Sequence, residues 1–94
     1  MFKLITGILT KYENQNSDAH SELNKYIQSN SKGAIEDMFV VIASTKRTEC
    51  KDFVLQAIKD FVNIIKSNEH YANLFMKHPD YEGIRWQLCV LGVL

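Results

Sequence analysis

The chain has 94 residues, and its content of 46% hydrophobic and 11% aromatic residues is typical of one packed globular domain spanning residues 1–94. Its 11 Lys and Arg residues balance 11 Asp and Glu residues, so the formal net charge is zero. Nucleic-acid binders and proteins that dock on anionic membranes usually carry a basic excess, so this balance argues against both classes. The apolar windows also fall short of the ~20 residues that a membrane-spanning helix needs.

Residues 2–13 show the spacing of an amphipathic helix. At about 100° per residue, one side of this helix collects six apolar residues, namely Phe2, Leu4, Ile5, Ile8, Leu9 and Tyr12. Thr6, Gly7 and Thr10 interrupt the apolar stretch, and no small-residue cleavage site follows it. These features indicate mature structure rather than a signal peptide.

A second helix is predicted over residues 18–29, after the polar turn ENQNSD. Ser17 is a suitable N-cap, and Asp18 in the first turn suits the helix dipole. The apolar stripe of this helix is narrow and consists of Ala19, Leu23, Tyr26 and Ile27. The segment SNSKG should end the helix, with Gly33 free to adopt a positive φ.

The segment AIEDMFVVIAS, residues 34–44, fits two secondary structures. Read as a helix it is apolar almost all round, and read as a strand it contains a short β-branched run at 38–43. Glu36 and Asp37 stand near its head, where acidic residues favour a helix N-terminus. We therefore expect a helix and keep the strand as the alternative.

The strongest helical signal covers residues 49–66. Polar side chains occupy one half of the helical wheel, while apolar side chains fill the other half and extend beyond it. One neighbouring helix cannot cover so broad an apolar arc, so we predict a central helix packed on two sides. Asn68 then caps a shorter helix, which Pro79 ends because the residue before a proline disfavours the helical conformation.

The C-terminal residues 84–94 are mostly apolar, and the first half of the segment alternates as a strand would. Pairing 84–91 with 38–43 would give an α+β fold with a two-stranded sheet, which we keep as the alternative. We favour a last helix that starts near Asp80, and with it an all-α fold, a small antiparallel bundle of about five to six helices. So apolar a tail should pack into the core, lie in a partner, or mark the chain as a fragment.

The side chains that could act in catalysis or bind a metal show no characteristic spacing in the sequence. His20, His70 and His78 match no metal-binding spacing, and we expect them to be solvent-exposed near helix ends. Cys50 and Cys89 have no paired spacing and fit reduced, buried thiols of a cytoplasmic protein. The four glycines are isolated, so the sequence contains no phosphate-binding loop. We therefore predict no catalytic residue, no metal, no cofactor and no enzymatic activity.

The densest basic spot is TKRT at residues 45–48. Such a cluster is usually a solvated turn, although it could contact a phosphate or an acidic partner. A small nucleic-acid-associated regulator is therefore kept as a minor alternative.

Residues 68–86 combine aromatic and methionine side chains with charged ones, a mixture that protein interfaces favour. A packed core explains most of the apolar members. Tyr81 and Arg85 flank Gly83, where we expect a loop that presents them outward. The candidate contacts are, first, Glu69, Asp80, Tyr81, Glu82 and Arg85 and, second, Glu36 and Asp37.

These observations favour a cytoplasmic, non-enzymatic domain that binds another protein. Its most concrete form is a bacterial immunity protein, whose acidic side chains would replace nucleic-acid phosphates in the basic cleft of a cognate, nuclease-like toxin. The alternative is an adaptor or a subunit of an oligomer, including a homodimer, with the apolar C-terminal segment buried at the interface.

Overall fold

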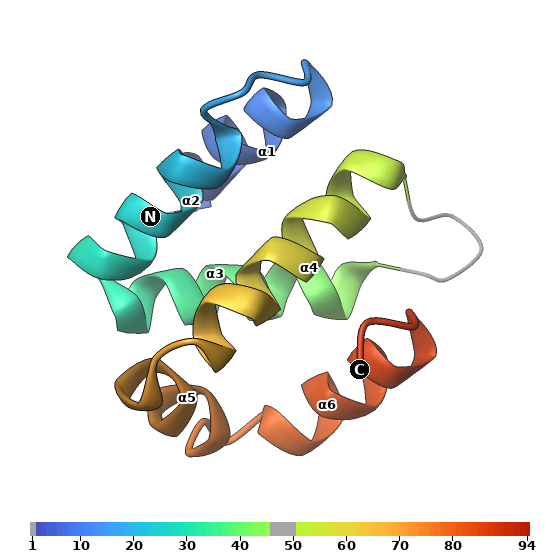
Figure 1. Ribbon diagram of the computed structural model, residues 1–94. Coiled ribbons are helices and arrows are strands. Elements are labelled where there is room, and N and C mark those ends of the chain that lie inside the picture. Colours follow the sequence, from blue (N-terminus) through green and yellow to red (C-terminus); the bar gives the residue numbers. More distant parts are fainter. Residues whose placement is uncertain (1, 46–50) are drawn as a thin grey trace.

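The computed structural model describes residues 2–45 and 51–94, which form six α-helices and no strand (Figure 1). In chain order the helices are α1 (Phe2–Glu13), α2 (Ala19–Ser29), α3 (Ser31–Ser44), α4 (Asp52–Lys66), α5 (Glu69–Met76) and α6 (Tyr81–Val90). The prediction of a small all-α bundle is confirmed. The alternative of a sheet is wrong, because 38–43 lies within α3 and most of 84–91 lies within α6.

The fourth helix is the central one. It contacts α1, α2, α3 and α5, and Figure 1 shows it crossing α3. Its apolar arc places Ile58 and Phe61 fully inside the core. The prediction that this segment packs on more than one side is confirmed. Its predicted start at residue 49 lies outside the described residues, within which α4 begins at Asp52.

The first two helices bury their predicted apolar stripes against each other and against α4. All four members of the α2 stripe, Ala19, Leu23, Tyr26 and Ile27, are buried. In α1, Ile5 and Ile8 are buried, whereas Leu4 is 58% exposed although it belongs to the predicted apolar side. Leu4 lies at the edge of that stripe, so the neighbouring helices cover the centre of the arc and leave this side chain outside.

A single residue, Asn30, separates α2 from α3. Its side chain accepts a hydrogen bond of 3.1 Å from the backbone N–H of Gly33, and this cap starts α3 at Ser31. Gly33 therefore belongs to the first turn of α3, and the expectation of a positive φ there is wrong. A Cβ at Gly33 would collide with the Asn30 amide, so a larger residue there would displace the capping side chain. Because α3 begins so early, Glu36 lies in its second turn rather than at its head.

Both ends of α5 and the start of α6 follow the sequence prediction. The Asn68 side chain accepts hydrogen bonds from the backbone N–H groups of His70 and Tyr71, at 2.9 and 3.2 Å, and so caps α5. That helix ends at Met76, before Pro79, and α6 starts directly after Asp80. The start of α5 is therefore fixed by a local cap, whereas the Asp80 side chain makes no cap hydrogen bond at the start of α6.

The apolar C-terminal segment packs on the core of the same chain. Ile84 and Leu88 of α6 are buried, while Leu91 and Val93 pack partly against the core. After α6, Gly92 adopts a φ of 79°, and the N–H of Val93 bonds to the carbonyl of Leu88 at 3.0 Å. This left-handed residue turns the chain back onto the helix that it follows.

The last helix lies beside α3 (Figure 1). These two helices are not consecutive, because α4 and α5 lie between them in the chain. Their packing leaves an open groove along one side of the molecule. Within residues 2–45 and 51–94, none of the helices combines the length and the apolar character that crossing a membrane requires.

Candidate functional site

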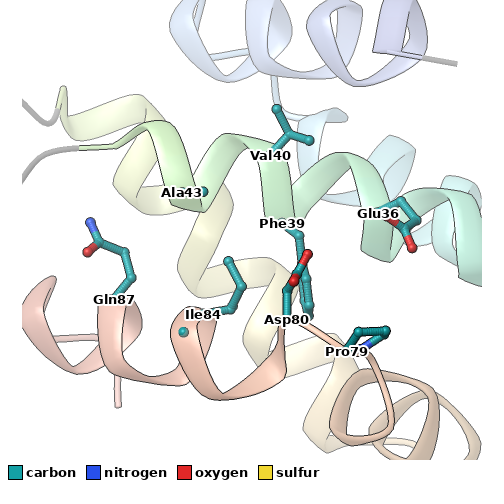
Figure 2. A pocket seen from close by; sticks show the side chains of 9 residues that line it. Glu36, Phe39, Val40, Ala43, Pro79, Asp80, Ile84 and Gln87 are labelled. Atoms are coloured by element: carbon teal, nitrogen blue, oxygen red, sulfur yellow. The ribbon is translucent and has the colours of Figure 1, made fainter.

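The candidate site is the open groove between α3 and α6, with a volume of about 560 Å³ (Figure 2). Its floor is apolar and is formed by Phe39, Ala43 and Ile84. Its rim is polar, with Glu36 and Asp80 at one end and Gln87 toward the other. An apolar floor with a polar rim is the general anatomy of a protein interface.

The α3 side of the groove is held by aromatic packing. Phe39 is buried and meets the ring of Phe75 edge-on, with the ring centroids 5.2 Å apart. The His78 ring lies against the same phenylalanine at a centroid distance of 4.3 Å. The next residue, Val40, projects away from α6 and is 53% exposed. The floor of the groove is therefore well packed at Phe39, while an apolar side chain remains exposed beside it.

The α6 side of the groove is open at Gly83. A Cβ at Gly83 would meet no atom within 4 Å, so the backbone of α6 is accessible at this point. Gln87, one turn later, donates a side-chain hydrogen bond to the backbone carbonyl of Thr45, at the end of α3. This bond ties the C-terminal end of α3 to α6 and fixes the width of the groove at that end.

A chain of hydrogen bonds through His78 orients the acidic end of the groove. Nε2 of His78 lies 2.6 Å from Oε1 of Glu36, and the backbone N–H of Asp80 donates to Nδ1 at 3.0 Å. Because Nδ1 accepts a hydrogen bond, the neutral ring carries its proton on Nε2 and donates it to the Glu36 carboxylate. The expectation of exposed histidines therefore fails for His78, whose side chain is 11% exposed.

The lining of the groove contains acidic side chains and no Lys or Arg. Two of its lining residues, Glu36 and Asp80, have carboxylates, and none of the lining residues is Lys or Arg. Within the described part of the chain, the Asp80 carboxylate forms no ion pair, and Glu36 pairs only with His78. The groove therefore suits a cationic ligand group.

The structure brings two of the seven predicted contact residues, Glu36 and Asp80, into the groove. Glu69 is exposed in the first turn of α5. Glu82 and Arg85 are exposed on α6, and Tyr81 is half-buried in the same helix, edge-on to Phe75 at a centroid distance of 5.4 Å. The expected loop around Gly83 is wrong, because these residues belong to the helix.

The last predicted contact, Asp37, faces the interior. It is 7% exposed, and its Oδ2 accepts a hydrogen bond of 2.5 Å from the hydroxyl of Tyr26. Burial, and then this bond, raises the pKa of Tyr26 to about 12. Asp37 therefore joins α3 to α2, and its predicted role as a partner contact does not fit this position.

The sequence prediction missed seven of the nine groove residues, among them the three that α3 contributes, Phe39, Val40 and Ala43. No local signal could have separated them from the core, because α3 is apolar almost all round. Which of its faces meets solvent depends on where α6 packs, and α6 lies far along the chain. The same is true of the bond between Glu36 and His78, which are 42 residues apart.

A second polar cluster surrounds Asp60 of α4. Its carboxylate accepts hydrogen bonds from the Tyr12 hydroxyl at 2.7 Å and from the Gln56 amide at 2.9 Å. His20 Nδ1 lies 3.3 Å from the same carboxylate. Burial, followed by the Asp60 contact, raises the pKa of Tyr12 well above its usual value. The cluster joins α1 and α2 to α4, which is a structural role.

The remaining predictions concern the cysteines, the basic segment, the other two histidines and metal binding. Cys89 is an exposed free thiol, so the expectation that it is buried is wrong, whereas Cys50 and most of the TKRT segment lie outside the described residues. His20 and His70 are exposed, as expected. Among the residues of both described segments, no group of three or more His, Cys, Asp or Glu side chains is placed to hold a metal ion.

Comparison of the chain with protein-family models, with curated proteins and with solved structures finds no match.

Proposed function

We propose that this chain is a non-catalytic domain that binds another protein through the groove between α3 and α6. The observation that carries the proposal is the pair of carboxylates, Glu36 and Asp80, at the edge of an apolar floor without a balancing cation. A partner gains most from such a surface when it fills the floor with an apolar side chain and meets the rim with Lys or Arg.

The geometry of the rim supports recognition of a cation. The Glu36 carboxylate is held by His78, and the backbone of Asp80 is held by the same ring, so the Glu36 carboxylate and the Asp80 backbone start from restrained positions. Restraint lowers the entropy lost when a partner binds. A guanidinium has planar, paired donors that match a carboxylate, and we therefore favour arginine on the partner.

Exposed apolar side chains near the groove support a protein partner over a small ion. Val40 is 53% exposed and Trp86 is 72% exposed. Trp86 follows Gly83 by three residues, so it lies one helical turn along on a neighbouring face of α6. Tryptophan is enriched among the residues that dominate binding energy in interfaces. A partner that covers the groove and this tryptophan would also cover the open backbone at Gly83.

The most concrete form of the proposal is a bacterial immunity protein acting in the cytoplasm. Its partner would be a nuclease-like toxin with a basic, substrate-binding cleft. Glu36 and Asp80 would take the place of substrate phosphates there, and the surrounding apolar contacts would keep the cleft closed to nucleic acid. This form requires no catalytic group on the chain.

The single tryptophan makes the proposal directly testable. The products of the genes that flank this one would be purified as catalytically inactive variants and titrated into the protein while Trp86 fluorescence is followed. We expect one of them to bind and to shift the emission toward that of a buried tryptophan. The double variant Glu36→Gln/Asp80→Asn should weaken binding by about tenfold or more. Glu13→Gln, an exposed acid of α1 outside the groove, is the matched control and should bind as the parent chain does.

Light scattering at several protein concentrations separates this proposal from an adaptor or oligomer subunit. An immunity protein should remain monomeric until its partner is added. If the chain alone forms a concentration-dependent dimer, and if that dimer covers Trp86, then the exposed groove is a self-association surface and the proposal fails.

A further inference from the structure

A second, more enclosed cavity lies between α4, α5 and α6, and it shares no lining residue with the groove described above. Its volume is about 150 Å³. Its lining is apolar, with Val62 and Ile65 from α4, Ala72 and Phe75 from α5, and Leu88 from α6. Most of these residues are buried, so they form the closed end of the cavity.

The opposite end of the cavity reaches solvent. Met76 and Leu94 line it and are each about half exposed, and Lys66 lines it as an exposed side chain of the last turn of α4. Lys66 is the only lining residue with a charged side chain, and it forms no ion pair within the part of the chain that the structure describes. Tyr81 adds a second polar side chain to the lining, and its hydroxyl makes no hydrogen bond to the described residues.

The volume of the cavity and the polarity of its lining together indicate the class of ligand that fits it. An apolar cavity of about 150 Å³ is large enough for one benzene ring and too small for a long acyl chain. A ligand group that fills the apolar closed end restores contacts that the walls otherwise lack. An ammonium group at the mouth favours a ligand whose outer end is anionic, and apolar walls with a few polar groups are typical of small-molecule sites.

From this combination we infer that the cavity binds a small carboxylate that carries a single aromatic ring or a branched aliphatic group of similar size. The ring enters between Ile65, Phe75 and Leu88. The carboxylate remains at the mouth, where Lys66 supplies the opposite charge and Tyr81 supplies a hydroxyl donor. The site is independent of the proposed function, since its occupant does not approach the groove.

A matched pair of probes tests the inference on the intact chain. Phenylacetate and its neutral amide, phenylacetamide, have the same ring and differ in the charge of the outer group. Each would be titrated into isotope-labelled protein while amide NMR shifts are followed. We expect both probes to shift the signals of Ile65, Ala72 and Leu88, with phenylacetate bound about fivefold more tightly, as one solvent-exposed ion pair allows.

Two variants with internal controls identify the contacts. Lys66→Gln should lower the affinity for phenylacetate to that for phenylacetamide. Lys59 is also exposed on α4 but lies outside the cavity, so Lys59→Gln should leave the affinity for both probes unchanged. Ala72→Leu should fill the cavity and abolish binding of both probes, whereas Asn73→Leu on the same helix should not.

Three results would overturn the inference. The first is the absence of shifts around the cavity with either probe at millimolar concentration. The second is equal affinity for the two probes, which would remove the role of Lys66 and the assignment to carboxylates. The third is unchanged binding in Ala72→Leu. If that variant does not fold, the comparison of Lys66→Gln with Lys59→Gln still decides the ligand class.

Discussion

The imidazole of His78 joins the loop before α6 to α3, with its Nε2 2.6 Å from Oε1 of Glu36. The same ring accepts the backbone N–H of Asp80 and packs on Phe39. One side chain thereby sets the position of both acidic residues of the groove. Stability and binding should both depend on this histidine.

Replacing His78 should therefore destabilise the fold. His78→Ala removes the ring contact with Phe39 and leaves the Asp80 N–H without its acceptor, so we expect the free energy of unfolding to fall by about 1–3 kcal/mol. Urea unfolding measures this change. His70→Ala, at an exposed histidine of α5, should stay within about 0.5 kcal/mol of the parent chain. Equal stability of the two variants would contradict the role given to His78.

The buried contact between Tyr26 and Asp37 predicts a loss of stability in Tyr26→Phe. Removal of the hydroxyl leaves the covered Asp37 carboxylate without its donor, which should cost about 1–3 kcal/mol of unfolding free energy. Chemical denaturation of the variant gives this value. Tyr71→Phe is the control, because the Tyr71 hydroxyl makes no hydrogen bond within the described residues. A loss as large in the control would show that the effect is not specific to the buried bond.

The same tyrosine predicts a stability limit at alkaline pH. Burial and the Asp37 contact raise the pKa of Tyr26 to about 12 from an ordinary value of 10.0, so the folded state holds its proton more tightly than the unfolded chain does. The resulting stabilisation is fully present below pH 10.0 and is lost as the pH rises through about 12. The pKa of Tyr12 is also raised, so it acts in the same direction.

Urea midpoints measured across this alkaline range, together with tyrosinate absorbance, test the pH prediction. The midpoint should fall as the buried phenols ionise, and Tyr26→Phe should show a smaller fall than the parent chain. A midpoint that rises or stays level from neutral pH to pH 12 would contradict it.

The turn after α1 offers a stabilising substitution. Gln15 has a φ of 57°, and the N–H of Asn16 bonds to the carbonyl of Lys11 at 3.0 Å, so Gln15 occupies the left-handed position of a helix C-cap. Glycine adopts this conformation without the steric cost of a Cβ, although it loses more entropy on folding. We expect Gln15→Gly to raise the free energy of unfolding by about 0.5–1 kcal/mol. Gln15→Val should lower the free energy of unfolding. Thermal unfolding of both variants shows whether each substitution stabilises or destabilises the fold.

Local chemistry explains why much of the fold could be predicted from the sequence. The ends of α5 depend on Asn68 and Pro79, which act within one helical turn of their own positions. The central place of α4 follows from the width of its apolar arc, since a helix that is apolar over more than half its circumference must be covered by several neighbours. Such features are encoded in a short stretch of chain, and the structure confirms them.

The sequence by itself thus determined that the chain is helical, where most helices end, and which helix is central. Only the tertiary structure decided which faces of α3 meet solvent. That helix is apolar almost all round, so its own pattern cannot tell Val40, which is exposed, from Asp37, which is buried. The positions of α2 and α6 make the distinction, because one supplies the Tyr26 hydroxyl to Asp37 and the other leaves an acidic groove beside Glu36.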